Sequence, residues 1–239
     1  MTKYGIVGDG RVARHMARYF DLSGLPHTTW SRREERATSN PAGISLASCD
    51  VVLVLISDAA IEPFIQAHDD LRDKTLVHFS GSLVTPLAQG MHPLSSFATE
   101  LYDLGTYQAI PFVCDEGAPG FVDVFPELSN PHYTIAGELK PLYHCMAVLA
   151  GNFTTTLWNK LFETFEERLQ LPKDVATPYL RQIASNLEHA PATAQTGPLA
   201  RNDRQTIRAN LEALGTDPYR DVYAAFVRAV APELLEGSP

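Results

Sequence analysis

Residues 4–13 decide the fold of this chain, and they read Tyr4-Gly5-Ile6-Val7-Gly8-Asp9-Gly10-Arg11-Val12-Ala13. The apolar run predicts a first strand, and the next six residues fit G-x-G-x-x-G/A at the start of a helix. In this pattern Gly8 permits a tight turn, Gly10 lets the backbone approach a diphosphate, and Ala13 keeps the helix close to the sheet. Asp9, Arg11 and Val12 complete a loop whose N–H groups and helix dipole favour phosphate. The stretch predicts a dinucleotide site, and the alternative is a glycine turn in a related fold that has lost its ligand.

Beyond this loop, short apolar runs alternate with helical patterns, as they do in the βαβ units of a parallel sheet. Strands are predicted at 28–30, 51–56, 75–79, 109–114 and 133–136, and helices at 11–20 and 61–71. After these strands the sequence shows helical patterns only, and helices are predicted at 139–171, 175–187, 204–214 and 219–230. The predicted class is α/β, with a Rossmann-type, mostly parallel sheet followed by a smaller all-α domain. We expect a dinucleotide-binding domain over 1–137 and a helical domain, with the substrate cleft, over 138–239.

The end of the second predicted strand indicates which dinucleotide is bound. NAD-binding sites of this kind place an acidic residue there, which bonds the ribose 2′-hydroxyl. This chain has Ser31-Arg32-Arg33, and guanidinium groups beside a hydroxyl favour a 2′-phosphate instead. We therefore expect NADP(H) rather than NAD, with a solvated basic loop as the alternative. S-adenosylmethionine sites on related folds also use an acid at this point, so methyl transfer is disfavoured.

Two further loops follow predicted strands, where the ligands of open α/β sheets bind. Ser57 and Asp58 follow the buried strand 51–56. His78, Ser80 and Gly81 lie at the end of the next strand and just after it. We assign all five residues to the cofactor site, and the alternative for them is turn formation or helix capping.

Composition limits the class of partner. The 239 residues are 45% hydrophobic and 20% charged, and the formal net charge of −9 disfavours nucleic acid. No apolar run approaches the ~18 residues of a membrane span. The N-terminal residues lack a secretory pattern, so we expect a cytoplasmic protein with no membrane partner. Widely spaced cysteines without a C-x-x-C predict free thiols and no metal site: Cys49, Cys114 and Cys145.

Hydride transfer to or from a nicotinamide needs a group that handles a proton, and histidine suits this task near neutral pH. His92 is expected in a loop after the strands, and His144 on the long helix, eight residues before Asn152. Two helical turns place His144 and Asn152 on roughly one side, so Asn152 can polarise a carbonyl or imine while either histidine handles the proton. Arg201, in a loop before a helix, is a candidate clamp for a substrate carboxylate. For each of these residues the alternative is a structural hydrogen bond or surface ion pair.

An apolar stripe runs along 139–171 for about nine helical turns, through Leu142, Met146, Leu149, Phe153, Leu157, Leu161, Phe165 and Leu169. The simplest interpretation is a core seam, and an equally plain one is a two-fold interface. We expect a homodimer formed through the helical domain.

These segments together resemble a family of Rossmann-like proteins that carry a C-terminal domain of unknown function. That family neighbours the 6-phosphogluconate dehydrogenase and ketopantoate reductase group. The resemblance covers essentially the whole chain and rests on residues 8–13, 78–81, 92–97, His144, 151–153 and 196–203. The last segment, which reads TGPLARND, is the most specific. The resemblance implies a nucleotide-binding domain, a helical domain and, often, a dimer.

The chain departs at one position from the hydroxyacid dehydrogenases that neighbour this family. Those enzymes carry a Lys and, four residues later, an Asn on the first long helix of the second domain. Asn152 matches the Asn, whereas Val148 occupies the position of the Lys. Lys160 lies two turns further on and does not replace it. The Lys that acts as general acid/base in those relatives therefore has no counterpart at this position of the chain.

Three functions stay open at this point. The first is an NADP-dependent oxidoreductase that transfers a hydride to or from a small anionic carbonyl, hydroxyl or imine compound. The second is a non-catalytic NADP(H)-binding sensor or regulator, which the missing Lys favours. The third is a structural Rossmann-like subunit that binds no nucleotide. We expect the enzyme.

Overall fold

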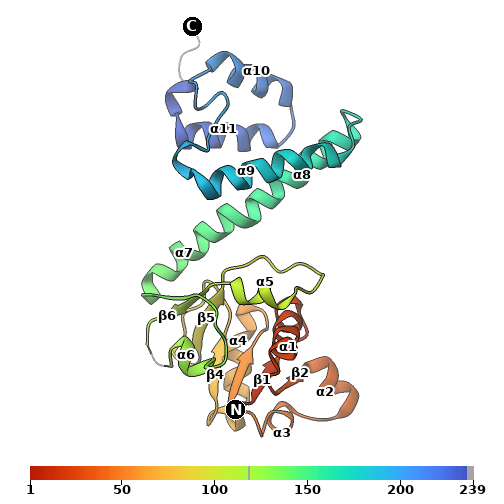
Figure 1. The fold of residues 1–239 in the computed structure, drawn as a ribbon, viewed down its shortest axis with the longest axis vertical. Coiled ribbons are helices and arrows are strands. Elements are labelled where there is room, and N and C mark those ends of the chain that lie inside the picture. Colours follow the sequence, from red (N-terminus) through yellow and green to blue (C-terminus); the bar gives the residue numbers. More distant parts are fainter. Residues whose placement is uncertain (118, 236–239) are drawn as a thin grey trace. The chain divides into compact units, whose positions relative to one another are not determined.

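The computed structural model describes residues 1–117 and 119–235. The chain divides into two compact units, Met1–Leu157 and Trp158–Pro239 (Figure 1). The described part of the first unit holds a seven-stranded sheet of order β2-β1-β3-β4-β5-β6-β7. Neighbouring strands are parallel, except that β5 and β6 are antiparallel. The strands are β1 (Tyr4–Val7), β2 (His27–Trp30), β3 (Val51–Val54), β4 (Thr75–His78), β5 (Gln89–Pro93), β6 (Phe112–Asp115) and β7 (His132–Ile135).

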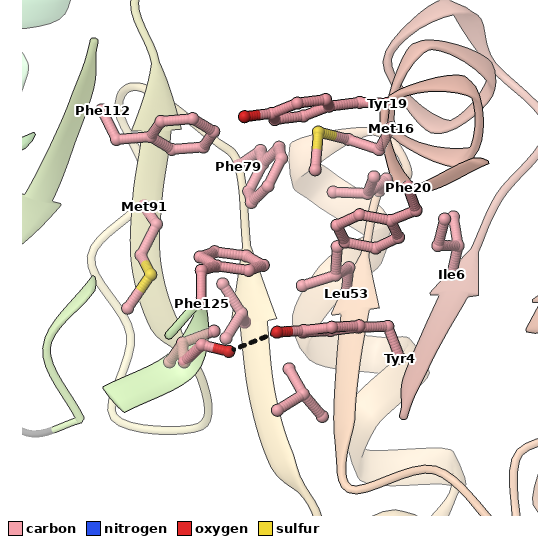
Figure 2. Packing of buried hydrophobic residues seen from close by; sticks show 14 of the residues in the cluster. Tyr4, Ile6, Met16, Tyr19, Phe20, Leu53, Phe79, Met91, Phe112 and Phe125 are labelled. Atoms are coloured by element: carbon pink, nitrogen blue, oxygen red, sulfur yellow. Dashed lines mark hydrogen bonds between the residues drawn. The ribbon is translucent and has the colours of Figure 1, made fainter. Parts of the chain in front are cut away.

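The sheet has a hydrophobic core on each face because successive side chains of a strand point to opposite faces. Tyr4 of β1 packs on one face with helix α1 (Arg11–Ser23), whereas Val7 packs on the other with α4 (Asp58–Ala67). Figure 2 shows the first core, where the Tyr4 ring meets Phe20 of α1 and Phe125. The buried Tyr4 hydroxyl donates a hydrogen bond to the Val124 carbonyl at 3.0 Å.

Helix α1 begins directly after the glycine loop and buries one face against β1 and β3. Its buried side chains recur at helical spacing: Ala13, His15, Met16, Tyr19 and Phe20. The helix ends where Gly24 adopts φ 67°, a left-handed conformation that glycine tolerates and that terminates helices. The other helices of this unit before residue 139 are short: α2 (Arg32–Thr38), α3 (Ala42–Ser45), α5 (Leu104–Ala109) and α6 (Phe121–Val124).

These elements confirm the predicted fold class, a Rossmann-type, mostly parallel sheet followed by a helical region. The expectation of a loop around His92 is wrong, because His92 lies within β5. That strand pairs with β4 on one side and β6 on the other. Gly90 and Pro93 have low strand propensity, so β5 has no local signal and depends on its two neighbours.

The helix predicted over 139–171 is interrupted. It consists of α7 (Lys140–Ala147), a π-helical segment (Val148–Phe153) and α8 (Thr154–Glu167). Single π-helical turns inside α-helices concentrate at functional sites. Strands give way to helices after Ile135, yet the first compact unit continues to Leu157. The division into domains 1–137 and 138–239 stays a prediction.

The second unit is helical in its described part. After the end of α8 it contains α9 (Thr177–His189), α10 (Arg204–Leu214) and α11 (Tyr219–Val230), close to the predicted ranges. Its core is small and is formed by Ile207, Val227, Ala231 and Leu234. Asp203 caps α10, because its carboxylate accepts a hydrogen bond from the Thr206 N–H at 3.0 Å. Among the helices of the described residues, none combines the length and the apolar character needed to cross a membrane.

The turn from β1 into α1 requires glycine at position 8. Gly8 has φ +124°, and a Cβ placed there would lie 2.4 Å from the Leu55 carbonyl oxygen. Its N–H donates to the Trp30 carbonyl at 2.8 Å, which ties the turn to the end of β2. Gly10 differs, because its φ is −71° and a Cβ there would meet nothing within 4 Å.

We expect Gly8→Ala to lower the free energy of unfolding by at least about 2 kcal/mol, because it combines backbone strain with a clash against a carbonyl. Gly10→Ala is the matched control and is expected to change that free energy by less than about 1 kcal/mol. Urea unfolding followed by circular dichroism measures both. Equal stability of the two variants would contradict this account of the turn.

Candidate functional site

The glycine loop opens on a cavity of about 420 Å³ at the carboxyl ends of the strands, here called the loop cavity. It is lined by Gly8, Asp9, Gly10, Arg11, Val12, Arg32, Val54, Leu55, Ile56, Ser57, Asp58, Phe79 and Ser80. Gly10 immediately precedes α1, and the first turn of α1 has no acidic residue to offset its dipole. Since nothing covers the position of a Cβ on Gly10, its backbone is open to an anionic ligand.

A second cavity of about 620 Å³, here called the arginine cavity, adjoins the first. The two share Gly8, Asp9, Arg32 and Ile56. Its remaining lining is Val7, Trp30, Ser31, Arg33, Arg36, Ala60, Pro63, Phe64 and His68. The aromatic part of this wall includes Phe64 stacked on His68, with ring centroids 4.1 Å apart. Flat aromatic faces of this kind suit a planar base.

Three exposed guanidinium groups face this cavity, from Arg32, Arg33 and Arg36. None of them forms an ion pair with an acid in the described part of the chain. Ser31 precedes α2 and caps it, since its hydroxyl accepts a hydrogen bond from the Glu34 N–H at 3.3 Å. Sequence reasoning missed Arg36, although its spacing of four residues from Arg32 matches one helical turn.

Asp58 joins the loops that follow β3 and β4. Its carboxylate accepts hydrogen bonds from the hydroxyls of Ser80 at 2.6 Å and Ser82 at 3.2 Å. The Ser80 hydroxyl in turn accepts a hydrogen bond from the Leu83 N–H at 2.9 Å. Asp58 and Ser80 therefore form one braced wall of the loop cavity, which also includes Ser57.

His78 lies beneath this wall and is fully buried. Its Nδ1 accepts a hydrogen bond from the Ser80 N–H at 3.2 Å, which leaves the proton of the neutral ring on Nε2. That Nε2 is buried without a hydrogen-bond partner in the described structure. His78 thus supports the Ser80 loop from behind.

A third cavity, of about 680 Å³, lies within the first unit between the end of β5 and the long helix and is here called the histidine cavity. It brings His92 together with two predicted residues that are distant from it in the sequence, His144 and Asn152. The rest of its lining is Leu94, Ser95, Ser96, Tyr143, Met146, Ala147, Val148, Ala150 and Gly151. Asn152 and Val148 both belong to the π-helical segment.

Gly81 lies between Ser80, which lines the loop cavity, and the two histidines of the histidine cavity. It follows Ser80 directly, and a Cβ on Gly81 would lie 2.5 Å from His144 Cδ2 and 3.0 Å from His92 Nε2. Both imidazoles therefore lie against the backbone of the loop that contains Ser80, a residue of the loop cavity. The rings of His92 and His144 are 6.1 Å apart, at an angle of 84°. Arg201 belongs to the second unit, where its N–H donates to the Gly197 carbonyl at 3.2 Å, and its role stays a prediction.

A buried ion pair anchors α7 to the sheet. Lys140, which is 1% exposed, places its Nζ 2.7 and 2.9 Å from the two carboxylate oxygens of Asp115 on β6. The pair lies over Gly90, where a Cβ would come within 2.4 Å of Lys140 Nζ and 2.2 Å of an Asp115 oxygen. Tyr143 and His144 follow Lys140 by three and four residues, so they occupy the same helical face. Lys140 and Tyr143 were not identified from the sequence, although their spacing of three residues on a predicted helix was a signal that they share one face.

His78 and His92 are neutral at physiological pH. Burial lowers the pKa of His92 to about 4, and the charges of His144 and Lys140 add to this effect. Burial and then Lys140 lower the pKa of His78 to about 4, against the opposing influence of Asp115 and Asp58. Burial also raises the pKa of Tyr143 to about 12. In the histidine cavity, His92 is therefore a neutral ring beside a protonated phenol.

The sheet, its glycine loop and the helices after β7 together define a Rossmann-type protein with a helical C-terminal region. Residues 115–230 match the family described as "Domain of unknown function (DUF2520)", in agreement with the resemblance inferred from the sequence motifs. No curated protein matches this chain.

Solved structures of similar fold cover nearly the whole chain. An inferred NADP oxidoreductase from Bacteroides fragilis is 24% identical, with 97% of this chain and 98% of that chain covered and a TM-score of 0.76. A reductive aminase from Aspergillus terreus, in complex with NADPH and ethyl levulinate, is 17% identical, with 99% and 95% covered and a TM-score of 0.64. An imine reductase from Streptomyces aurantiacus is 14% identical, with 99% and 100% covered and a TM-score of 0.66. At these identities the likeness establishes the fold.

The lowered pKa values predict that stability falls on acidification. A histidine in the unfolded chain titrates near 6.5, so between that pH and about 4 the unfolded state binds protons that His78 and His92 do not. The stability associated with their neutral forms is complete above about pH 7 and is lost as the pH falls through this window. We expect each histidine to account for a loss on the order of 1–3 kcal/mol.

Urea unfolding at about pH 7 and about pH 5 measures this loss. His92→Gln removes one of the two groups and is expected to shrink the difference between the two pH values. His189→Gln, at an exposed position on α9, is the control and is expected to leave the difference unchanged. Equal pH dependence in all three proteins would refute the prediction.

Proposed function

We propose that this protein is an NADP(H)-dependent oxidoreductase that transfers a hydride to or from a small, anionic carbonyl, hydroxyl or imine compound. The observation that carries the proposal is the arrangement of three cavities within the first unit. The loop cavity and the arginine cavity share four lining residues, and two histidines of the histidine cavity lie against Gly81, the residue after Ser80 of the loop cavity. Open glycine backbone lies in the middle, three unpaired guanidinium groups lie at one end, and two histidines with an amide lie at the other. The fold-level neighbours described with NADPH, or as imine reductases, support the same class.

The residues present fit NADP(H). Gly10 and the N-terminus of α1 favour the diphosphate, and the wall of Phe64 and His68 suits the adenine. Arg32 and Arg33 favour the 2′-phosphate, because a guanidinium group pairs with phosphate through two parallel hydrogen bonds. An acid at this position, as in NAD-binding sites, would repel that phosphate. When bound, the cofactor supplies or accepts the hydride.

The chain's own residues would orient the substrate and move the proton. Asn152 offers an amide donor that polarises a carbonyl or imine, and His92 or His144 exchanges the proton at the substrate oxygen or nitrogen. A substrate carboxylate would pair with a guanidinium group, and Arg201 stays our candidate for that contact. Reduction adds one hydride to carbon and one proton to oxygen or nitrogen, and oxidation removes the same pair.

A non-catalytic NADP(H) sensor is the second candidate. One observation favours it: Val148, an apolar side chain, lines the histidine cavity at the position where the neighbouring hydroxyacid dehydrogenases carry their Lys. A sensor would bind the cofactor with the same arginines and glycine loop. The two candidates differ only in turnover.

We expect NADPH to raise the thermal midpoint more than NADH at equal concentration, because only NADPH brings a 2′-phosphate to the arginine cavity. Arg32→Glu is expected to weaken NADPH binding roughly 10- to 100-fold and to change NADH binding little. Arg18→Glu, on the exposed side of α1, is the matched control and should leave both unchanged. Titration calorimetry measures the affinities.

Absence of binding to either nucleotide would overturn the proposal and leave a structural subunit. With binding shown, NADPH oxidation is measured against keto acids and imines, in the wild type and in His92→Gln. Turnover that falls at least about 100-fold in the variant supports the enzyme. Tight NADPH binding without turnover of any compound favours the sensor.

We also propose a homodimer formed through the long helix. Four large apolar side chains on α7 and the π-helical segment are exposed and recur at helical spacing: Leu142 (61%), Met146 (49%), Leu149 (45%) and Phe153 (50%). A row of this size on the surface of one chain is typical of an interface. The core-seam interpretation does not account for these four residues, because they are not buried within the chain.

Leu149→Glu is expected to convert the dimer into a monomer, because it places a charge in the middle of the row. Ile44→Glu, at a residue 68% exposed on α3, is the control and should leave the mass unchanged. Light scattering after size-exclusion chromatography measures the mass. A wild-type monomer at all concentrations would disprove the dimer.

A further inference from the structure

We propose that Tyr143 is a positioning residue that sets the tautomer of His92, so that Nδ1 accepts a hydrogen bond from the phenol and Nε2 carries the proton toward the substrate. This inference deepens the proposed function and rests on it, because the oxidoreductase proposal left the division of tasks between His92 and His144 open. The neutral Nε2–H of His92 then polarises the substrate oxygen or nitrogen. Proton exchange is left to His144.

The first observation is the contact itself. Tyr143 Oη lies 2.7 Å from His92 Nδ1, and the rings meet edge to face with centroids 5.6 Å apart. A phenolic O–H is a stronger acid than the N–H of a neutral imidazole, and an imidazole lone pair is the stronger base. The phenol therefore donates and Nδ1 accepts. The described residues offer the Tyr143 hydroxyl no second partner that would reverse this direction.

The second observation is the direction of the opposite nitrogen. His92 Nε2 lies 3.0 Å from the position that a Cβ on Gly81 would take, and His144 Cδ2 lies 2.5 Å from the same position. Gly81 follows Ser80, which lines the loop cavity, and His92 itself lines the histidine cavity. Nε2 thus lies against the Ser80–Gly81 backbone, on the side of His92 opposite the Tyr143 contact. A donor at that point lies between the cofactor side and the space for a substrate.

The third observation explains why the geometry is fixed. The ion pair between Lys140 and Asp115 holds the first turn of α7 against β6, over Gly90. Gly90 and His92 are two residues apart on β5, so they share one face of the sheet. Tyr143 follows Lys140 by three residues and is carried to that same face. The rotation of α7 about its axis is therefore set by a buried charge pair, and Tyr143 has a defined position relative to His92.

Tyr143 and His144 have different roles because they occupy different positions on α7. Tyr143 contacts Nδ1 of His92, and the His144 ring packs against Gly81. The phenol stays protonated near neutral pH, because burial raises its pKa to about 12. Tyr143 consequently keeps its donor proton throughout the pH range in which the enzyme would work, and its effect is orientation rather than proton release.

The test is a measurement of the tautomer in the full-length protein without cofactor or substrate. Long-range proton–nitrogen correlation spectra of the ¹⁵N-labelled chain report, for each ring nitrogen, whether it bears a proton. His92→Gln identifies the His92 signals by their disappearance. We expect Nε2 protonated and Nδ1 unprotonated in the wild type. In Tyr143→Phe the two nitrogens should move toward a mixture of tautomers, whereas Tyr133→Phe, at an exposed tyrosine, should change nothing.

A wild-type spectrum with the proton on Nδ1 would overturn the inference, whatever the variants do. Unchanged His92 signals in Tyr143→Phe would also overturn it. Because the spectra require no turnover, a failure here is distinct from a failure of the oxidoreductase proposal. If a substrate is turned over, Tyr143→Phe is expected to lower kcat about 10-fold with little change in KM, because it removes orientation and no substrate contact.

Discussion

The candidate site depends on one buried ion pair. Lys140 and Asp115 are withdrawn from water, and such a pair is stable only when the two charges meet closely and their remaining groups are satisfied. Gly90 provides the space, since any side chain there would collide with both partners. The pair fixes where α7 begins and how it is rotated. Everything that α7 brings to the sheet edge, including Tyr143 and His144, follows from that contact.

The same charge pair influences the chemistry of its neighbours. Burial is the main cause that lowers the pKa of His78 and His92, and the Lys140 ammonium group adds to it, so both act as neutral hydrogen-bonding rings at neutral pH. His78 accepts a hydrogen bond from the Ser80 N–H, and His92 lies against Gly81, the next residue. Lys140, whose contact with Asp115 orients α7, therefore also contributes to the neutral state of these two histidines.

Charge is distributed unevenly over the chain, and positive charge gathers at the arginine cavity. The chain has a net charge of −9, yet Arg32, Arg33 and Arg36 gather at one cavity beside the uncompensated N-terminus of α1. A local positive field in an acidic protein favours a small anion at this cavity. The histidine cavity combines apolar side chains with convergent polar groups from the histidines, Tyr143 and Asn152, which is typical of sites for small molecules.

The sequence by itself determined the features that arise from neighbouring residues: the strand–loop–helix at 4–13, the helices α10 and α11, the glycine at position 8 and the arginine pair after β2. These features depend on local periodicity, backbone conformation and nearby charge, and their signals lie within a few residues. Only the tertiary structure decided that His92 lies in β5, that Lys140 meets Asp115, and that Tyr143 reaches His92. Lys140 and Asp115 are 25 positions apart, and Tyr143 and His92 are 51 positions apart. These contacts depend on burial and strand pairing between distant segments, so no short stretch of sequence predicts them.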